Sequence, residues 1–309
     1  MDNELFAIDV GYSYVKVIDG GGNLFKFHSV VVPYVDDGVK KDGFSGVISL
    51  DGKQWLVGNV DEGSVLSIND TFHGSENWRV LLCWAFFRRC YELKTNFLEI
   101  DHLALGVPYN QYKDTIIPLL TERKSFDFYV DDKEYSIKIN NIRVYPQGLA
   151  ILANYNEHTI GIVDIGYHTL DVVLMKNKKI IRSRSTSTTK GVNQVFMSVS
   201  RVINKTLGTT DISWDKVYRV ITTGEIKYKK RVYDFKNEVA SILLSYSREI
   251  ESSVKSLWKD DYDFIDHVIV AGGGAELLRT YLGDFGEIAS SSIYSNVTAY
   301  MTMLKSEVK

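Results

Sequence analysis

The feature that most constrains this chain is a segment that occurs twice, 155 residues apart. Residues 8–27 read IDVGYSYVKVIDGGGNLFKF, and residues 163–182 read VDIGYHTLDVVLMKNKKIIR. Each copy predicts an apolar strand, a D-x-G turn, a second strand, a tight turn and a third strand. A repeat spaced by half of the chain indicates two related domains, each of which opens with a β-hairpin.

The rest of each half alternates predicted strands with predicted helices, which is typical of the α/β fold class. After the first copy we expect a helix over residues 77–93, a buried strand over 103–107 that ends at Pro108, a helix over about 109–120, a hairpin over 127–144 with its turn at DDK, and a helix from Pro146 through Ala153. After the second copy we expect helices over 192–203 and 239–257, a strand over 268–271, and a helix over 275–282. Two stretches fit this plan poorly and are interpreted as small insertions: the Gly- and Asp-rich residues 33–71, and the Lys-rich residues 214–230, which have little periodicity.

Composition excludes several classes of protein. With 36 Lys plus Arg against 39 Asp plus Glu, the formal charge is −3, too close to neutral for a chain that coats nucleic acid by charge. Cys83 and Cys90 stand seven residues apart in an apolar stretch, so both are predicted to be reduced core thiols. No apolar signal core and no run of about 18 apolar residues occurs, and we therefore expect a soluble cytoplasmic protein.

The first copy of the repeat carries a candidate anion site. Gly11 follows a predicted buried strand, where it lets the backbone approach an anion, and successive amides of the turn can form a nest. Ser13 adds a hydroxyl, and Lys16 is placed to reach a phosphate as a point charge. Asp9, at the end of the strand, is suited to hold Mg²⁺ through water. An ordinary Asp-Gly hairpin would read the same way, so this motif alone leaves both interpretations open.

The second copy, DIGYHTLD, repeats the arrangement. Asp164 aligns with Asp9 and Gly166 with Gly11, Thr169 supplies a hydroxyl, and Asp171 stands where Lys16 stands in the first copy. Two such loops, one in each domain, would face each other across a cleft and clasp a polyphosphate. The two aligned carboxylates would then converge on one magnesium ion.

A third glycine motif lies near the end of the chain, in VIVAGGGAELL. Gly272, Gly273 and Gly274 stand between a predicted strand and a predicted helix, where they allow a flat ligand group to rest on the backbone. The motif is not G-x-G-x-x-G, so it does not indicate a dinucleotide fold.

Together, the three motifs resemble those of the actin-like ATPase superfamily, in particular the ParM-type actins that segregate bacterial plasmids. The resemblance covers essentially the whole chain in motif order. It implies a duplicated, ribonuclease H-like α/β fold of two domains around a nucleotide cleft. Domain I would be residues 1–150, with a small outer subdomain at about 33–75 and a C-terminal helix, about 294–309, that returns to it. Domain II would be residues 151–293, with a small outer subdomain at about 205–235.

The resemblance also implies roles for individual residues. Gln147 would orient the attacking water, with Asp9 and Asp164 as the other catalytic residues and as the magnesium ligands. The nucleotide-binding residues would be Gly11, Tyr12, Ser13, Lys16, Gly166, Tyr167, His168, Thr169, Gly191, Gly272, Gly273 and Gly274. The family has a small residue near Ala299 and an Asn near Thr298, so the last helix is the weakest match.

By resemblance, we expect a self-assembling polar filament that binds ATP, or GTP, with Mg²⁺ and whose slow hydrolysis times disassembly. Its partner would be a ParR-like adaptor bound to plasmid DNA, with no direct contact to nucleic acid and none to a membrane. Two alternatives stay open: a small-molecule kinase of the same superfamily, and a non-hydrolysing actin-like scaffold.

Overall fold

The computed structural model describes residues 4–34, 46–58, 72–112, 116–148, 151, 155 and 158–308. The chain divides into two compact units, and each is described by itself. Unit 1 consists of Met1–Asn156 together with Tyr294–Lys309, and unit 2 of Glu157–Ile293. Among the described residues, no helix combines the length and the apolarity that crossing a membrane requires.

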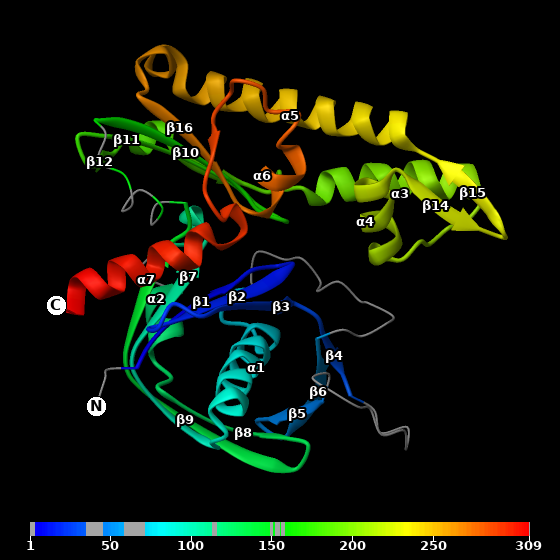
Figure 1. Ribbon diagram of the computed structural model, residues 1–309. Helices are drawn as coiled ribbons and strands as arrows, with labels where there is room; N and C mark the ends of the chain where they lie inside the picture. The colour runs from blue at the N-terminus through cyan, green and yellow to red at the C-terminus, as the bar shows by residue number, and fades with distance from the viewer. Residues whose placement is uncertain are drawn as a thin grey trace. The chain divides into compact units, whose positions relative to one another are not determined.

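Unit 1 is built on a nine-stranded sheet with the order β3-β2-β1-β7-β9-β8-β5-β6-β4 (Figure 1). The strands are β1 (Leu5–Val10), β2 (Tyr14–Asp19), β3 (Leu24–His28), β4 (Val31–Pro33), β5 (Val47–Leu50), β6 (Lys53–Val57), β7 (Phe97–Val107), β8 (Ser125–Val130) and β9 (Lys133–Pro146). Strand β7 pairs in parallel with both β1 and β9, whereas the other neighbours are antiparallel.

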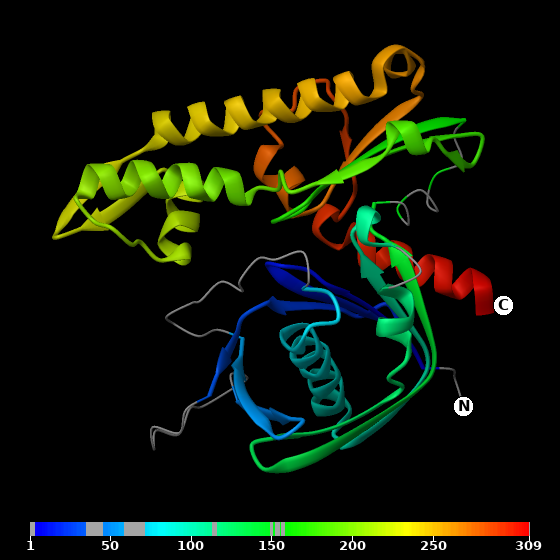
Figure 2. The same ribbon diagram turned by 180° about the vertical axis from the view of Figure 1, so that it is seen from behind.

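Two helices cover opposite faces of this sheet. Helix α1 (Glu76–Leu93) begins at Ser75, whose side chain accepts from the Trp78 N–H, and it lies within the curve of the sheet (Figures 1 and 2). Its Phe86 packs against Phe6 of β1 with ring centroids 6.3 Å apart. Helix α7 (Ser295–Val308) packs on β1, β2 and β7 from the other face. Two shorter elements, η1 (Tyr109–Gln111) and α2 (Ile116–Thr121), follow β7.

Close packing under α7 depends on a glycine. A Cβ at Gly106 of β7 would collide with the Tyr300 hydroxyl. On the other side of the sheet, Cys83 and Cys90 of α1 are fully buried free thiols, as predicted. Burial raises the pKa of both thiols, that of Cys90 to about 11.

Unit 2 is built on a six-stranded sheet with the order β12-β11-β10-β16-β17, and β13 also pairs with β11. The strands are β10 (Thr159–Ile165), β11 (Leu170–Lys176), β12 (Lys179–Ile180), β13 (Thr186–Thr188), β16 (His267–Ala271) and β17 (Glu287–Ile288). The helices are α3 (Asn193–Leu207), α4 (Trp214–Thr223), α5 (Lys236–Trp258) and α6 (Gly273–Leu278). A separate hairpin joins β14 (Glu225–Tyr228) to β15 (Arg231–Asp234), and the short 3-10 turns are η3 (Arg182–Arg184), η4 (Lys259–Phe264) and η5 (Ser292–Tyr294).

The core of unit 2 lies between the sheet and α3 and α5, and its largest buried side chain is Trp258 at the end of α5. The Trp258 ring lies directly over Gly161 of β10, where a Cβ would collide with it. Its indole N–H donates to the Arg184 carbonyl at 3.0 Å. The long helix is thereby anchored to the strand that carries the second copy of the repeat.

The duplication predicted from the repeat is confirmed. In unit 1, β1, β2 and β3 form an antiparallel meander and β1 pairs in parallel with β7. In unit 2, β10, β11 and β12 do the same, and β10 pairs in parallel with β16. Both sheets therefore open with the same topology, and the expected α/β class is correct.

Several predicted elements differ from those observed. Pro146 is the last residue of β9, paired with Val107, and does not open a helix; residues 149–150 and 152–154 lie outside the described residues. The strand predicted over 103–107 begins at Phe97, because it pairs with β9 along its whole length. The helix expected over 275–282 is α6, which starts and ends earlier. The helix expected over 109–120 divides into η1 and α2, with 113–115 outside the described residues.

The largest error concerns residues 214–230, which have more structure than predicted. Helix α4 buries Val217, Val220 and Ile221 on one face, and the β14–β15 hairpin follows it. A single window over this stretch mixes the helical period of 3.6 with the strand period of 2, so neither stands out. In the stretch 33–71, residues 35–45 and 59–71 lie outside the described residues, and the others form β4's end, β5 and β6.

Candidate functional site

The first copy of the repeat holds Asp9 in a network of polar contacts. Asp9 is the penultimate residue of β1, and the antiparallel register places Lys16 of β2 directly opposite. The Lys16 Nζ lies 3.0 Å from Asp9 Oδ2, and the Gln147 Nε2 donates to Asp9 Oδ1 at 3.0 Å. Asp9 is 3% exposed and Gln147 8%. Three residues predicted to act together from distant parts of the sequence are therefore brought into contact.

The turn between β1 and β2 is closed tightly around Gly11. The Gly11 N–H donates to the Tyr14 carbonyl at 3.2 Å, and a Cβ at position 11 would lie 3.0 Å from the Lys16 Nζ. Ser29 supports the turn from β3's end: its N–H donates to the Ser13 carbonyl at 2.9 Å and its hydroxyl to the Gly11 carbonyl at 2.5 Å. The lysine ammonium thus stays next to the backbone of the turn, which is the arrangement an anion site needs.

Gln147 is held by its backbone as well as by its side chain. Its N–H donates to the Val107 carbonyl at 2.7 Å, and the next amide, of Gly148, donates to Asn296 Oδ1 at 2.9 Å. Asn296 lies in the first turn of α7 and is buried. The sequence did not predict this contact of Asn296, although an Asn at the start of a predicted helix is a signal for a polar contact at that end.

Aromatic side chains cover the first turn. The Tyr12 ring lies 4.7 Å from that of Phe72 and 6.0 Å from the His73 imidazole, measured between centroids. His73 is buried, and burial lowers its pKa to about 4 although the nearby Asp9 carboxylate acts in the opposite direction. The imidazole is therefore neutral at physiological pH. No sequence argument pointed to His73, because a lone His before a helix is most often structural.

The second copy repeats the turn with a different charge pattern. The Gly166 N–H donates to the Thr169 carbonyl at 2.9 Å, which is the same bond, in the aligned positions, as the one from Gly11 to Tyr14. Asp164 stands opposite Asp171 in the register of β10 and β11, and the two are 4% and 1% exposed. Where the first copy has an ion pair, the second therefore has two opposed buried carboxylates.

Three backbone amides from the segment before α3 hold this second turn. The Gly191 N–H donates to the His168 carbonyl at 3.0 Å, that of Val192 to the Gly166 carbonyl at 3.0 Å, and that of Asn193 to the Tyr167 carbonyl at 2.9 Å. A Cβ at Gly191 would collide with the Tyr167 carbonyl. The absence of a side chain at Gly191 thus lets this segment pack directly against the backbone of the turn.

The glycine motif after β16 lies beside Asp164. Gly272 has a φ of 85°, and a Cβ there would collide with Asp164 Oδ1. A Cβ at Gly274 would collide with Ile165 and Val192, whereas Gly273 has its nearest neighbour, Ile293, 3.9 Å away. Unit 2 therefore gathers its predicted residues, Asp164, the 166–169 turn, Gly191 and the glycine motif, at one end of β10 and β16. The convergence of Asp9 with Asp164 stays a prediction, because the two residues belong to different units.

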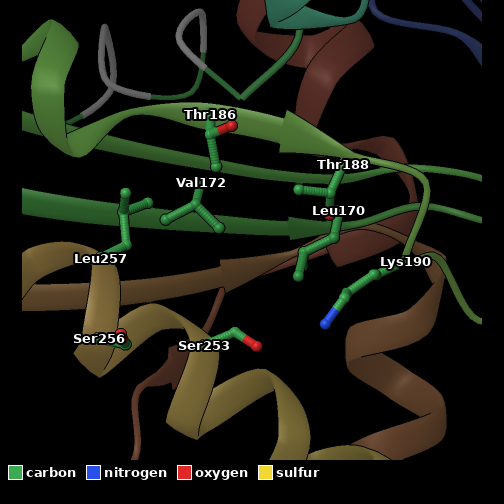
Figure 3. A pocket seen from close by; sticks show the side chains of 8 residues that line it. All are labelled: Leu170, Val172, Thr186, Thr188, Lys190, Ser253, Ser256 and Leu257. Carbon is green, nitrogen blue, oxygen red and sulfur yellow. The ribbon is translucent and has the colours of Figure 1, made fainter.

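Unit 2 also contains a cavity of about 340 Å³. It lies between the β11–β13 edge and α5, where Leu170 and Val172 point from β11 toward the helix (Figure 3). Asp171, between these two residues, faces the other side of the sheet. Lys190 lines the cavity, and its Nζ pairs with Glu249 at 2.7 Å. None of the nucleotide-site residues predicted from the sequence lines it.

The donor set suits a hydrated magnesium ion bound to phosphate. Among the residues that the structure describes, no group of three or more His, Cys, Asp or Glu side chains is placed to hold a metal. Mg²⁺ typically keeps several waters and takes only one or two carboxylates together with substrate phosphates. Asp9 and Asp164, each next to a glycine turn, are chemically suited to that mode of binding.

Two family models match segments that together cover most of the chain. The family model "Actin like proteins N terminal domain" matches residues 7–149, and the model "Archaeal actin homologue MreB-like, C-terminal" matches residues 162–284. No curated protein sequence matches the chain.

Three solved structures illustrate the likeness of the fold. A 15-stranded ParM filament from Clostridium botulinum is 18% identical with a TM-score of 0.82, covering 99% of this chain and 100% of the other. The archaeal actin homologue Ta0583 in complex with ADP is 17% identical with a TM-score of 0.82, covering 98% and 99%. Bacillus thuringiensis ParM with ATP is 16% identical with a TM-score of 0.73, covering 100% of both chains.

Proposed function

Because the chain belongs to the actin-like ATPase superfamily, with similarity to its ParM members, we propose that it binds ATP, assembles into a polar filament and hydrolyses the nucleotide slowly. The observation that carries the proposal is the duplicated Asp-Gly hairpin, with Gln147 hydrogen-bonded to the first of its two aspartates. A duplicated turn of this kind supplies one phosphate-facing surface for each unit.

The chain's own residues have distinct roles in this proposal. Lys16 supplies positive charge beside the first turn, and the hydroxyls of Ser13 and Thr169 would donate hydrogen bonds to phosphate oxygens. The backbone N–H groups of Gly11 and Gly166 already donate to carbonyls within their own turns. The proposed donors to phosphate are therefore the next backbone N–H groups, at positions 12–13 and 167–168. Tyr12, Tyr167 and His168 would contact the nucleotide through this backbone, and Gly272, Gly273 and Gly274 would lie against the nucleoside.

Gln147 is the residue proposed to orient water. Its Nε2 is held by Asp9, so the amide presents Oε1 as the acceptor for a water proton. An amide is too weak a base to remove that proton, so its contribution is orientation, as in other phosphoryl transfers. Bound Mg²⁺ would neutralise phosphate charge, with Asp9 and Asp164 holding its water ligands.

The proposed filament follows from the symmetry of its contacts. A head-to-tail contact between identical chains does not close on itself and so builds an open helical polymer. If the ATP-bound form polymerises better than the ADP-bound form, hydrolysis limits the lifetime of the filament. With a formal charge of −3, the chain has no excess of positive charge with which to bind DNA directly. We therefore propose plasmid segregation through a ParR-like DNA-bound adaptor.

The decisive experiment is high-speed pelleting of the full chain with ATP, with GTP, with ADP or without nucleotide, in Mg²⁺ buffer, with phosphate release measured on the same samples. ATP- or GTP-dependent pelleting with slow phosphate release supports the proposal. Turnover without pelleting, stimulated by a sugar or an acid, would identify a small-molecule kinase instead. Pelleting without phosphate release would identify a scaffold.

A further inference from the structure

A stack of aromatic rings in unit 2 extends from the second turn to α4. Trp214 is the first residue of α4, and its ring lies parallel to Phe196 of α3 at 5.0 Å and to Tyr218 of α4 at 5.3 Å, between centroids. The interplanar angles are 11° and 4°. The Tyr167 ring meets Phe196 edge-on at 5.6 Å. The stack thus starts in the turn that follows Gly166.

Trp214 makes a hydrogen bond in addition to its ring contacts. Its indole Nε1 donates to the Tyr167 hydroxyl at 3.1 Å. The Tyr167 carbonyl in turn accepts from the Asn193 N–H, so this residue is held at both ends, by α3 through its backbone and by α4 through its side chain. Burial of the ring raises the pKa of Tyr167, so the hydroxyl keeps its proton near neutral pH.

We propose that Trp214 is a positioning residue for the 166–169 turn, acting through the Tyr167 hydroxyl, so that nucleotide affinity depends on α4. The inference rests on the proposed function, because it assigns the phosphate contacts to this turn. A turn held in one conformation loses less conformational entropy when it binds an anion than a turn that must be ordered first. Removing the indole N–H should therefore weaken binding without removing any group that touches the nucleotide.

The outer end of the stack reaches the surface of unit 2. Tyr218, the last ring of the stack, is 45% exposed. A partner that contacts Tyr218 would therefore touch a ring that is connected to the 166–169 turn through Trp214 and Phe196. Residues 214–223 in this way have a role beyond that of an insertion on the outside of the domain.

The test compares Trp214→Phe and Tyr167→Phe, which keep an aromatic ring at each position but remove the donor and the acceptor, with the double variant. Trp258→Phe is the matched control, because it removes another buried indole hydrogen bond, to the Arg184 carbonyl, with no contact to the turn. For each full-length protein, calorimetry gives the Kd of Mg-ATP and of Mg-ADP, below the concentration that pellets, and thermal unfolding gives Tm.

We expect each single variant to weaken Mg-ATP binding about three- to tenfold, the usual range for one hydrogen bond. The Kd of the double variant should not exceed that of the weaker-binding single variant, because both substitutions remove the same hydrogen bond. Trp258→Phe should lower Tm and leave both Kd values unchanged. A wild-type Kd in Trp214→Phe, or additive losses in the double variant, would overturn the inference alone. Absence of nucleotide binding by the wild type would overturn the proposed function together with it.

Discussion

The Gln147 Nε2 donates to Asp9 Oδ1 at 3.0 Å across 138 residues of sequence. Asp9 is the penultimate residue of β1 and Gln147 follows β9, and β7 lies between these two strands in the sheet. The contact fixes the amide of Gln147 in one orientation. It also uses one oxygen of Asp9, while Lys16 contacts the other, so each oxygen has one protein partner and keeps a lone pair for a further bond.

Replacing Gln147 with Ala should lower the rate of ATP hydrolysis about tenfold or more, because a positioned group is lost from the water. Nucleotide affinity should change much less, and ATP filaments should persist longer. Phosphate release and light scattering on the same samples measure these effects. Gln54→Ala, at an exposed position of β6, is the control and should match the wild type. An unchanged hydrolysis rate in Gln147→Ala would assign the water to another residue.

Replacing Lys16 with Met should destabilise the chain by about 3 kcal/mol, because it leaves the buried Asp9 carboxylate without its ion pair. Urea unfolding measures this free energy. Lys53→Met is the control: Lys53 pairs with Glu76, but the two side chains are 64% and 40% exposed. That loss should stay within about 0.5 kcal/mol. Equal losses for the two variants would mean that Asp9 gains little from the pair.

Replacing Asp164 with Asn should abolish most hydrolysis and leave the free energy of unfolding unchanged or raised. The substitution conserves shape and removes one of two buried carboxylates that stand opposite each other, an arrangement in which like charges are unfavourable. Urea unfolding and phosphate release give the two results. A marked loss of stability, like that expected for Lys16→Met, would show that the negative charge of Asp164 is required for folding. Phosphate release at the wild-type rate would exclude Asp164 from the reaction.

Because of His73, the free energy of unfolding should fall as the pH is lowered from 6.5 to 4. The unfolded chain binds a proton at His73 below its ordinary pKa of 6.5, whereas burial holds the folded pKa at about 4. Since the unfolded state binds more protons in this window, acid favours unfolding, by roughly 3 kcal/mol at its lower limit. Urea unfolding at pH 7, 5.5 and 4.5 should show a smaller loss in His73→Leu than in the wild type. His267→Gln, at an exposed position, should follow the wild-type curve.

The repeat in the sequence was enough to predict the two hairpins, their turns and the duplicated topology. Asp9, Gly11 and Lys16 could be placed because strand alternation and a tight turn are local properties. The contacts of Gln147 could not, since they depend on the pairing of β7 with β9 and on α7, which returns to unit 1 from the far end of the chain.

Other features escaped prediction for identifiable reasons. Helix α4 was hidden because a hairpin of a different period follows it within a few residues. The side chains of Asn296 and Ser29 each bond to a distant backbone group, and such a contact leaves no pattern in the sequence. The ring stack from Tyr167 to Tyr218 brings together residues from a turn and two helices, so only the folded unit reveals it.

The buried thiols of α1 have a practical consequence for following assembly in real time. Maleimide dyes react with the thiolate, and Cys83 and Cys90 are both enclosed and both resist ionisation. A single cysteine introduced on an exposed side chain would therefore take up the dye selectively, without removal of either native thiol. Growth and shrinkage of the proposed filaments could then be followed by microscopy in an otherwise unaltered chain.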